Sequence, residues 1–235
     1  MKKMFRKMLS NLNIAAALVV AIVFAGVIGS ASYALAALTA TSAFTQTINA
    51  GTLSIDIVDE NNSTVGSPSV ALSAATFSFS CQSTTGTLGT STQKIYVQNP
   101  DANDGAWSVT IAASNPTDAF VSAGTDLDFN DPTTSGCTDG GDADAYKGQM
   151  SLNATAGTLI AGNCLTCTTD NVSKGTYAQF SQNATDTITI LTGAAEADDI
   201  GDWMLTGVAV TQTIPAEQPA AADYTISLTM TVGAA

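Results

Sequence analysis

Oxygen-bearing side chains crowd one Asp/Gly-rich stretch of this 235-residue chain, residues 125–147. A hard cation such as calcium is bound by several oxygen ligands, so the stretch is a candidate calcium site. It departs from the EF-hand pattern, because Asp131 stands where the sharp turn normally has Gly, and no Glu follows at the twelfth position. A solvated acidic loop tethered by Cys137 is the alternative. The candidate ligands are Asp126, Asp128, Asn130, Asp131, Asp139, Asp142 and Asp144.

The four cysteines offer a second chemistry. They are Cys81, Cys137, Cys164 and Cys167. An even number of cysteines in an exported chain favours disulfides, although the sequence leaves the pairing open. The Cys164-x-x-Cys167 pair is also compatible with a redox centre or half a zinc site. Because the chain contains no histidine and no thioredoxin-like pattern surrounds the pair, we expect structural disulfides, with a zinc site of all four thiolates as the alternative.

The residue types needed for catalysis are scarce. A chain without histidine lacks the usual general base that titrates near neutral pH. No Gly-rich phosphate loop occurs. A pair of carboxylates of the glycosidase type remains conceivable among the 20 acidic residues, but two Trp and five Tyr supply few aromatic platforms for a sugar. We therefore expect no enzyme, and a glycan-active enzyme is the least favoured alternative.

The amino terminus has the pattern of an export signal. Four basic residues lie within the first seven positions, no further charge occurs before Asp56, and residues 14–29 are almost purely aliphatic. Ala34 and Ala36 flank Leu35 as small residues do at a cleavage site. We predict a signal peptide at residues 1–36. Residues 14–38 are also long enough to span a bilayer, so an uncleaved membrane anchor is the alternative.

Removal of residues 1–36 would leave a strongly acidic chain. Three lysines then face 20 acidic residues, which gives a net charge of about −17. Such a charge repels polyanions, so we expect no nucleic acid partner and contact with a membrane only through an uncleaved amino terminus. Metal cations, basic proteins and cationic polymers are the partners that an acidic surface attracts.

Alternating apolar and polar residues recur from residue 53 onward, which is typical of strands with one buried face. Turn-forming residues separate the segments, and no linker divides residues 37–235. The pattern predicts a single all-β domain, an antiparallel β-sandwich of Ig-like or jelly-roll-like type that follows an amino-terminal signal or anchor helix. The predicted strands cover residues 53–57, 77–81, 95–97, 107–111, 150–152, 188–190, 205–210 and 224–232.

Three motifs together resemble a known family. They are Thr47-Ile48-Asn49-Ala50-Gly51-Thr52-Leu53-Ser54-Ile55, Gly105-Ala106-Trp107-Ser108-Val109-Thr110, and Ile214-Pro215-Ala216 followed by Tyr224-Thr225-Ile226-Ser227-Leu228-Thr229-Met230. In order and spacing they look like the start, middle and end of a WxL-type bacterial surface domain. The resemblance implies an exported β-rich protein that associates noncovalently with the cell wall. Trp107 and Trp203 are the candidate wall contacts, and a core role is the alternative for both.

The segment that leads into Ala50-Gly51-Thr52-Leu53 is also similar to the start of camelysin and TasA-like secreted proteins, which can form fibres. Leu38, Ala40, Phe44 and Ile48 would share one face of an extended strand. Such a strand can complete the sheet of a neighbouring copy, or it can be the first strand of its own domain. We therefore expect a secreted, non-catalytic cell-surface protein that associates with the wall or envelope. The alternative is a self-assembling fibre or surface-lattice subunit that uses residues 38–48.

Overall fold

The chain forms two compact units, Met1–Ile48 and Asn49–Ala235, in the computed structural model. The described residues are 7, 11, 13, 14, 16–19, 42–100, 105–122, 125–132, 135–142, 144–162, 164, 167–197 and 200–234. In the first unit the described residues up to 19 are helical, and residues 42–48 belong to no helix or strand. None of the helical residues described makes a helix long and apolar enough to cross a membrane. Most of the predicted signal or anchor, together with Leu38 and Ala40, lies outside the described residues.

The second unit is built from strands, with one short 3-10 helix, η1, at Ala154–Ala156. The strands are β1 Ser54–Val58, β2 Gln82–Leu88, β3 Lys94–Asn99, β4 Trp107–Ala113, β5 Phe120–Ser122, β6 Thr125–Leu127, β7 Gln149–Asn153, β8 Thr158–Ala161, β9 Val172–Lys174, β10 Tyr177–Gln179, β11 Thr187–Gly193, β12 Gly201–Thr206, β13 Val208–Ile214 and β14 Leu228–Ala234.

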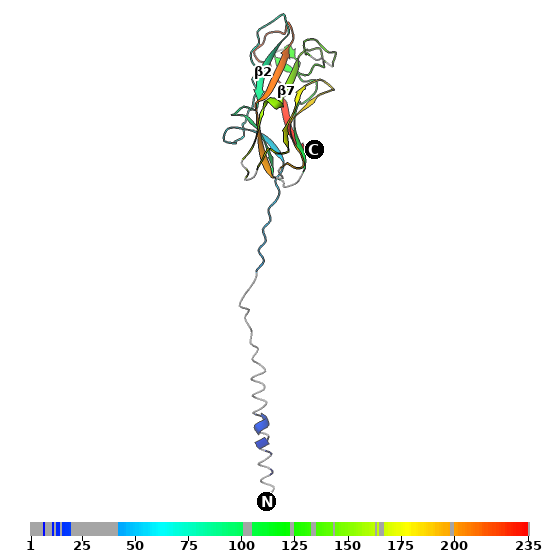
Figure 1. Ribbon diagram of the computed structural model, residues 1–235. Coiled ribbons are helices and arrows are strands. Elements are labelled where there is room, and N and C mark those ends of the chain that lie inside the picture. Colours follow the sequence, from blue (N-terminus) through cyan, green and yellow to red (C-terminus); the bar gives the residue numbers. More distant parts are fainter. Residues whose placement is uncertain are drawn as a thin grey trace. The chain divides into compact units, whose positions relative to one another are not determined.

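These strands form three four-stranded antiparallel sheets and one hairpin. The orders are β1-β3-β12-β8, β10-β7-β13-β2 and β14-β4-β11-β9, and β5 pairs with β6. In Figure 1 the labelled strands β2 and β7 flank the orange strand β13, as the second order requires. The prediction of an all-β chain with antiparallel sheets packed as a β-sandwich is thereby confirmed.

The core follows from the alternation in the sequence. Every second residue of β4 is buried, beginning with Trp107, because successive side chains of a strand point to opposite faces. The rings of Trp107 and Trp203 lie 5.2 Å apart and are 2% and 0% exposed. Gly193 and Gly201 lie against these two rings, where a Cβ atom would collide with the indoles. The packing therefore supports the core role for both tryptophans and leaves neither ring an exposed surface with which to contact a wall polymer.

The strand predicted at residues 77–81 is wrong. Phe77 and Phe79 are 50% and 78% exposed, and the strand begins at Gln82 instead. The sequence of β2 shows little alternation of apolar and polar residues. This strand is held in place mainly by its pairing with the neighbouring strand β13. Seven residues of β2 pair in register with β13, from Gln82 opposite Ile214 to Leu88 opposite Val208. Backbone hydrogen bonds of this kind are independent of the side chains, so the pattern of the sequence does not reveal them.

The strand predicted at residues 205–210 is divided in two. β12 ends at Thr206, β13 begins at Val208, and the two strands belong to different sheets. Gly207 joins them with a φ of +77°, a conformation that a residue with a Cβ atom rarely adopts. The chain thus turns a corner at a glycine and passes from one sheet to the next within a single residue.

Candidate functional sites: an acidic centre and an apolar groove

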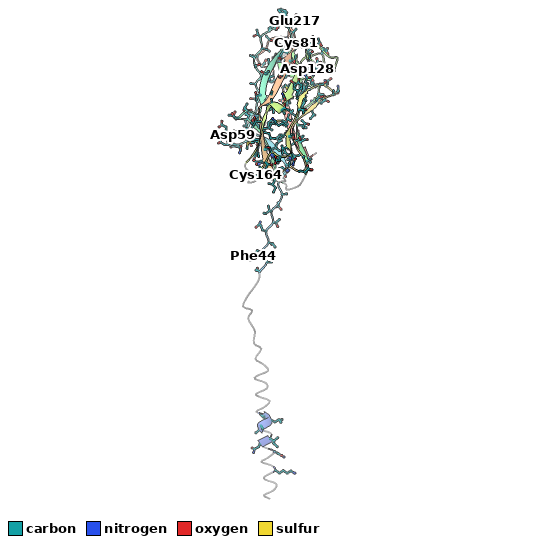
Figure 2. The ribbon with its side chains drawn as sticks, viewed as in Figure 1. Phe44, Asp59, Cys81, Asp128, Cys164 and Glu217 are labelled. Atoms are coloured by element: carbon teal, nitrogen blue, oxygen red, sulfur yellow. A yellow bond between two sulfur atoms is a disulfide. The ribbon has the colours of Figure 1, made fainter. Side chains whose placement is uncertain are left out.

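The loop between β6 and β7 contains a cluster of carboxylates. One carboxylate oxygen from each of Asp128, Asp142 and Asp144 lies within 4.8 Å of the other two. We call these three residues the acidic centre. Asp128 is 0% exposed, and the other two residues are partly buried. In Figure 2 Asp128 and Cys81 lie toward the same end of the β unit, and Cys164 lies toward the other end.

Each of the three carboxylates uses one oxygen to shape its own loop. Oδ1 of Asp128 accepts hydrogen bonds from the backbone N–H groups of Phe129 and Asn130, at 2.6 and 3.1 Å. Oδ1 of Asp142 accepts from the N–H of Asp144 at 3.3 Å, and Oδ1 of Asp144 accepts from the next residue but one at 2.8 Å. Oδ2 of all three is buried and has no hydrogen-bond partner among the described residues. The loop therefore leaves three buried acceptor atoms unused.

The charges of the acidic centre repel one another. Burial raises the pKa of Asp128 to about 7, and the negative charges of Asp144 and Asp142 add to the shift, while the two backbone N–H groups oppose it. Burial also raises the pKa of Asp142, followed by the charges of Asp144, Asp131 and Asp139. Crowded carboxylates without a counter-charge are costly, so the arrangement suits a bound cation.

Buried amide side chains fix the backbone beneath the acidic centre. Gln212 of β13 donates a hydrogen bond from Nε2 to the carbonyl oxygen of Asp128 at 2.8 Å. Gln149 of β7 donates from Nε2 to the carbonyl of Asp131 at 2.9 Å. Sequence reasoning missed these glutamines. A signal was present, because Gln212 occupies an inward position that Val208 and Val210 fill earlier in the same strand.

The structure brings three of the seven predicted ligands into one cluster. Asn130 and Asp131 are fully buried close by in the chain, and Oδ1 of Asn130 has no partner among the described residues. Asp139 is exposed and accepts a hydrogen bond from the N–H of Gly141 at 2.7 Å. Asp126 lies apart in β6, where its carboxylate accepts a hydrogen bond from Tyr146 and raises the pKa of that hydroxyl.

Both pairs of cysteines are disulfides, as predicted. Cys81 is joined to Cys137 and Cys164 to Cys167, with Cα–Cα distances of 5.7 and 5.3 Å. No thiolate remains among the four, so the alternative of a four-thiolate zinc site is wrong. The first disulfide connects the acidic loop to the residue that precedes β2.

A groove lies between two sheet edges on the β unit. β2 is the edge strand of one sheet and β14 the edge strand of another. A cavity of about 370 Å³ is lined by residues of both strands, and a second cavity of about 340 Å³ is lined by residues of β2 but not of β14. The two cavities share Val70, Leu72, Phe120 and Tyr224 in their linings. Neither lining contains Asp or Glu, so paired carboxylates do not face these cavities. Core residues reach the first cavity, and we call the whole feature the apolar groove. Those core residues are Ile111, Met150, Leu152 and Val210.

The stretch that leads into β14 forms one wall of the apolar groove. The sequence predicts a strand over residues 224–232, but regular pairing begins only at Leu228. Before it, Thr225 makes an isolated bridge to Val121. The predicted apolar face of Tyr224, Ile226 and Leu228 points inward, yet each of these residues is only partly buried because it lines the groove. The clearest apolar face in the sequence therefore lacks a covering strand among the described residues.

The last residues of the first unit are extended and carry two large apolar side chains four positions apart. Residues 42–48 form no helix or strand, and Phe44 and Ile48 are 95% and 88% exposed. Figure 2 shows Phe44 on this extended segment. Residues four apart share one face of a strand, so the two side chains would enter the same surface together.

Comparison with known proteins finds no matching family model, no similar curated protein and no similar solved structure. The resemblance to WxL domains and to camelysin and TasA-like proteins rests on the sequence motifs alone and remains a prediction.

Proposed function

We propose that the chain is a non-catalytic, extracellular structural protein of the cell surface whose copies associate through strand addition. The segment around Phe44 and Ile48 of one copy would occupy the apolar groove of another. The observation that carries this proposal is the pairing of an uncovered apolar groove with an exposed apolar segment in the same chain. The two disulfides support an oxidising, extracellular setting.

Strand addition suits the groove because an extended segment can lie along its apolar lining. Part of the β2 edge is already bonded within the chain, since the N–H of Ser73 donates to the carbonyl of Thr85 at 2.8 Å. An added strand gains main-chain hydrogen bonds at a sheet edge, and its alternate side chains fill pockets below. Residues 42–48 would extend over about 23 Å in strand conformation. Gln46 falls between Phe44 and Ile48 on the same face, and the lining of the groove includes the amides of Gln82 and Gln212.

Burial of the apolar side chains of the segment contributes favourably to the free energy of association. Phe44 and Ile48 are almost fully exposed in the isolated chain. Burial of each such side chain contributes about 1.5 to 3 kcal/mol. The two together would contribute about 3 to 6 kcal/mol before the main-chain hydrogen bonds are considered. Direct wall binding has less support, because the two tryptophans expected to contact a polymer are buried.

The test compares two faces of the same segment. The exported protein is examined by negative-stain electron microscopy and by analytical ultracentrifugation, beside the double variants Phe44→Ser with Ile48→Ser and Thr45→Ala with Thr47→Ala. We expect polymers for the wild type and for the threonine variant, and monomers for the Phe44/Ile48 variant. A wild type that stays monomeric across the concentration range would contradict the proposal.

Mixing two variants tests whether the segment and the groove recognise each other. Ile226→Asp places a charge in the groove and leaves the segment intact. The Phe44/Ile48 variant keeps its groove but lacks a competent segment. If copies associate, a mixture of the two variants forms a heterodimer and stops there. The heterodimer forms whether wild-type segments fill their own groove or that of another copy, so the wild type decides between the two. Wild-type polymers indicate strand exchange, wild-type monomers beside a heterodimer indicate that each segment fills its own groove, and a mixture that contains monomers alone would contradict the pairing of segment and groove.

A further inference from the structure

The acidic centre has the geometry of a shared ligand set. Calcium binds oxygen at about 2.3 to 2.6 Å, so two ligands of one ion lie no more than about 5 Å apart. Oxygens of Asp128, Asp142 and Asp144 are within 4.8 Å of one another, which meets this requirement for all three pairs. A single ion between them would therefore contact three carboxylates from two parts of the loop.

A second observation, independent of the clustering, also indicates a ligand. Asp128 is completely buried, and its Oδ2 has no hydrogen-bond partner among the described residues. Its Oδ1 is already held by two backbone N–H groups, so the carboxylate is oriented and Oδ2 is its remaining acceptor. Buried polar atoms in folded proteins almost always have a partner, and a cation provides one here.

The donor set indicates the class of cation. Carboxylate oxygens are the ligands of hard cations, whereas zinc and copper prefer nitrogen and sulfur. The chain has no histidine, and its four cysteines are paired. Calcium tolerates irregular geometry and several carboxylates, while magnesium demands near-octahedral geometry and keeps much of its water. An irregular loop with three carboxylates therefore favours calcium.

We propose that Asp128, Asp142 and Asp144 bind one calcium ion, which closes the loop between β6 and β7. Asp128 belongs to the part of the loop that Gln212 fixes to β13. Asp142 and Asp144 belong to the outer part, beyond the disulfide at Cys137. The ion would tie the outer part to the fixed part. This site is separate from the proposed strand addition, and either can fail without the other.

The first experiment measures the exported, disulfide-bonded protein by calorimetry and thermal unfolding at constant ionic strength, in excess calcium, excess magnesium and excess EGTA. We expect one calcium per chain and a rise in Tm of about 5 to 10 °C at 100 times the Kd. The effect of magnesium at the same concentration should be much smaller. An unchanged Tm in calcium and EGTA would overturn the site, and an equal effect of magnesium would overturn its assignment to calcium.

The second experiment removes ligands without disturbing the loop. Asp142→Asn and Asp144→Asn each retain the Oδ1 atom that accepts the backbone hydrogen bond, and each loses one charged ligand. Asp170→Asn removes the same charge from an exposed residue outside this loop and is the matched control. We expect at least tenfold weaker calcium binding in the first two variants and none of this loss in the control. Wild-type affinity in Asp142→Asn, or an equal loss in Asp170→Asn, would overturn the proposal.

Discussion

The acidic centre and the apolar groove are both incomplete, but in different ways. The acidic centre lacks a counter-charge at one point, where three carboxylates meet above a backbone that buried glutamines hold in place. The groove lacks apolar cover over the length of a strand, between two sheet edges. A small ion matches the first deficit, and the proposed extended segment matches the second. What each region lacks, a counter-charge in one and apolar cover in the other, thus indicates the kind of ligand that it would bind.

The two regions also share a strand. Val210 of β13 lines the groove, and Gln212, two residues further along, holds the backbone of Asp128. Cys81 and Cys137 connect the start of β2 to the acidic loop. Two of the variants described next, the Phe44/Ile48 double variant and Gln149→Met, test whether completion of one region affects the other.

The largest expected effect concerns the groove. Replacement of Phe44 and Ile48 by Ser removes about 3 to 6 kcal/mol of apolar burial, so the concentration needed for assembly should rise at least about 100-fold. Sedimentation over a concentration series measures this shift. Calcium affinity should remain that of the wild type, and a change in it would show that the regions are coupled.

The disulfide between the two regions should affect stability next most strongly. It closes a loop with a sequence separation of 56 residues, against 3 for the other pair. Loop entropy predicts a loss of about 4 kcal/mol for Cys81→Ser with Cys137→Ser, and about 2 kcal/mol for Cys164→Ser with Cys167→Ser. Chemical denaturation of both double variants compares them directly. An equal loss in the two would contradict the loop-entropy account.

A smaller effect is expected from the support beneath the acidic centre. Gln149→Met keeps a similar volume but removes the hydrogen bonds to the carbonyl oxygens of Asp131 and Phe180. Loss of such outer support weakens metal affinity by about tenfold or more. Calorimetry with calcium tests this, and sedimentation of the same variant should show unchanged assembly. Affinity equal to that of the wild type would mean that this hydrogen bond does not orient the site.

The smallest expected effect is that of Asp142→Asn on Tm. It separates the repulsion between the carboxylates of the acidic centre from their binding of calcium. In EGTA, Asp142→Asn removes one of the mutually repelling charges, so its Tm should exceed that of the wild type by a few degrees. In calcium the order should reverse. Thermal unfolding in both solutions measures the two differences. A variant that melts below the wild type in EGTA would show that the carboxylates of the centre are not under electrostatic stress.

Local patterns made much of the fold predictable. Trp107, Val109 and Ile111 alternate because one face of β4 is buried. In β1, Ile55 and Ile57 alternate in the sequence but are only partly buried, and Val58 is the buried residue of that strand. β2 was unpredictable because its ladder to β13 depends on backbone groups far away in the sequence. The predicted face at residues 224–232 was correctly oriented, but the sequence does not show that its first half pairs through an isolated bridge of Thr225 to Val121.

The composition of residues 125–147 indicated an acidic site, but it did not show which residues form that site. Which carboxylates meet depends on the path of the loop, which places Asp142 and Asp144 beside Asp128. Three glycines of this loop, Gly136, Gly141 and Gly148, have positive φ. The pairing of the cysteines depends in the same way on a distance between Cα atoms. Patterns in the sequence indicate which faces of a strand are buried. They do not indicate which residues far apart in the sequence come into contact.

The Cys81–Cys137 disulfide has a further consequence for a protein exposed to proteases. Every strand from β2 to β6 lies between the two cysteines. A single cleavage of the backbone anywhere from residue 82 to residue 136 would therefore leave both fragments covalently joined. Such nicked molecules would migrate as one species on a gel without reductant and as two after reduction. In the cell-surface role proposed above, the linkage would keep the two parts of a cleaved subunit together.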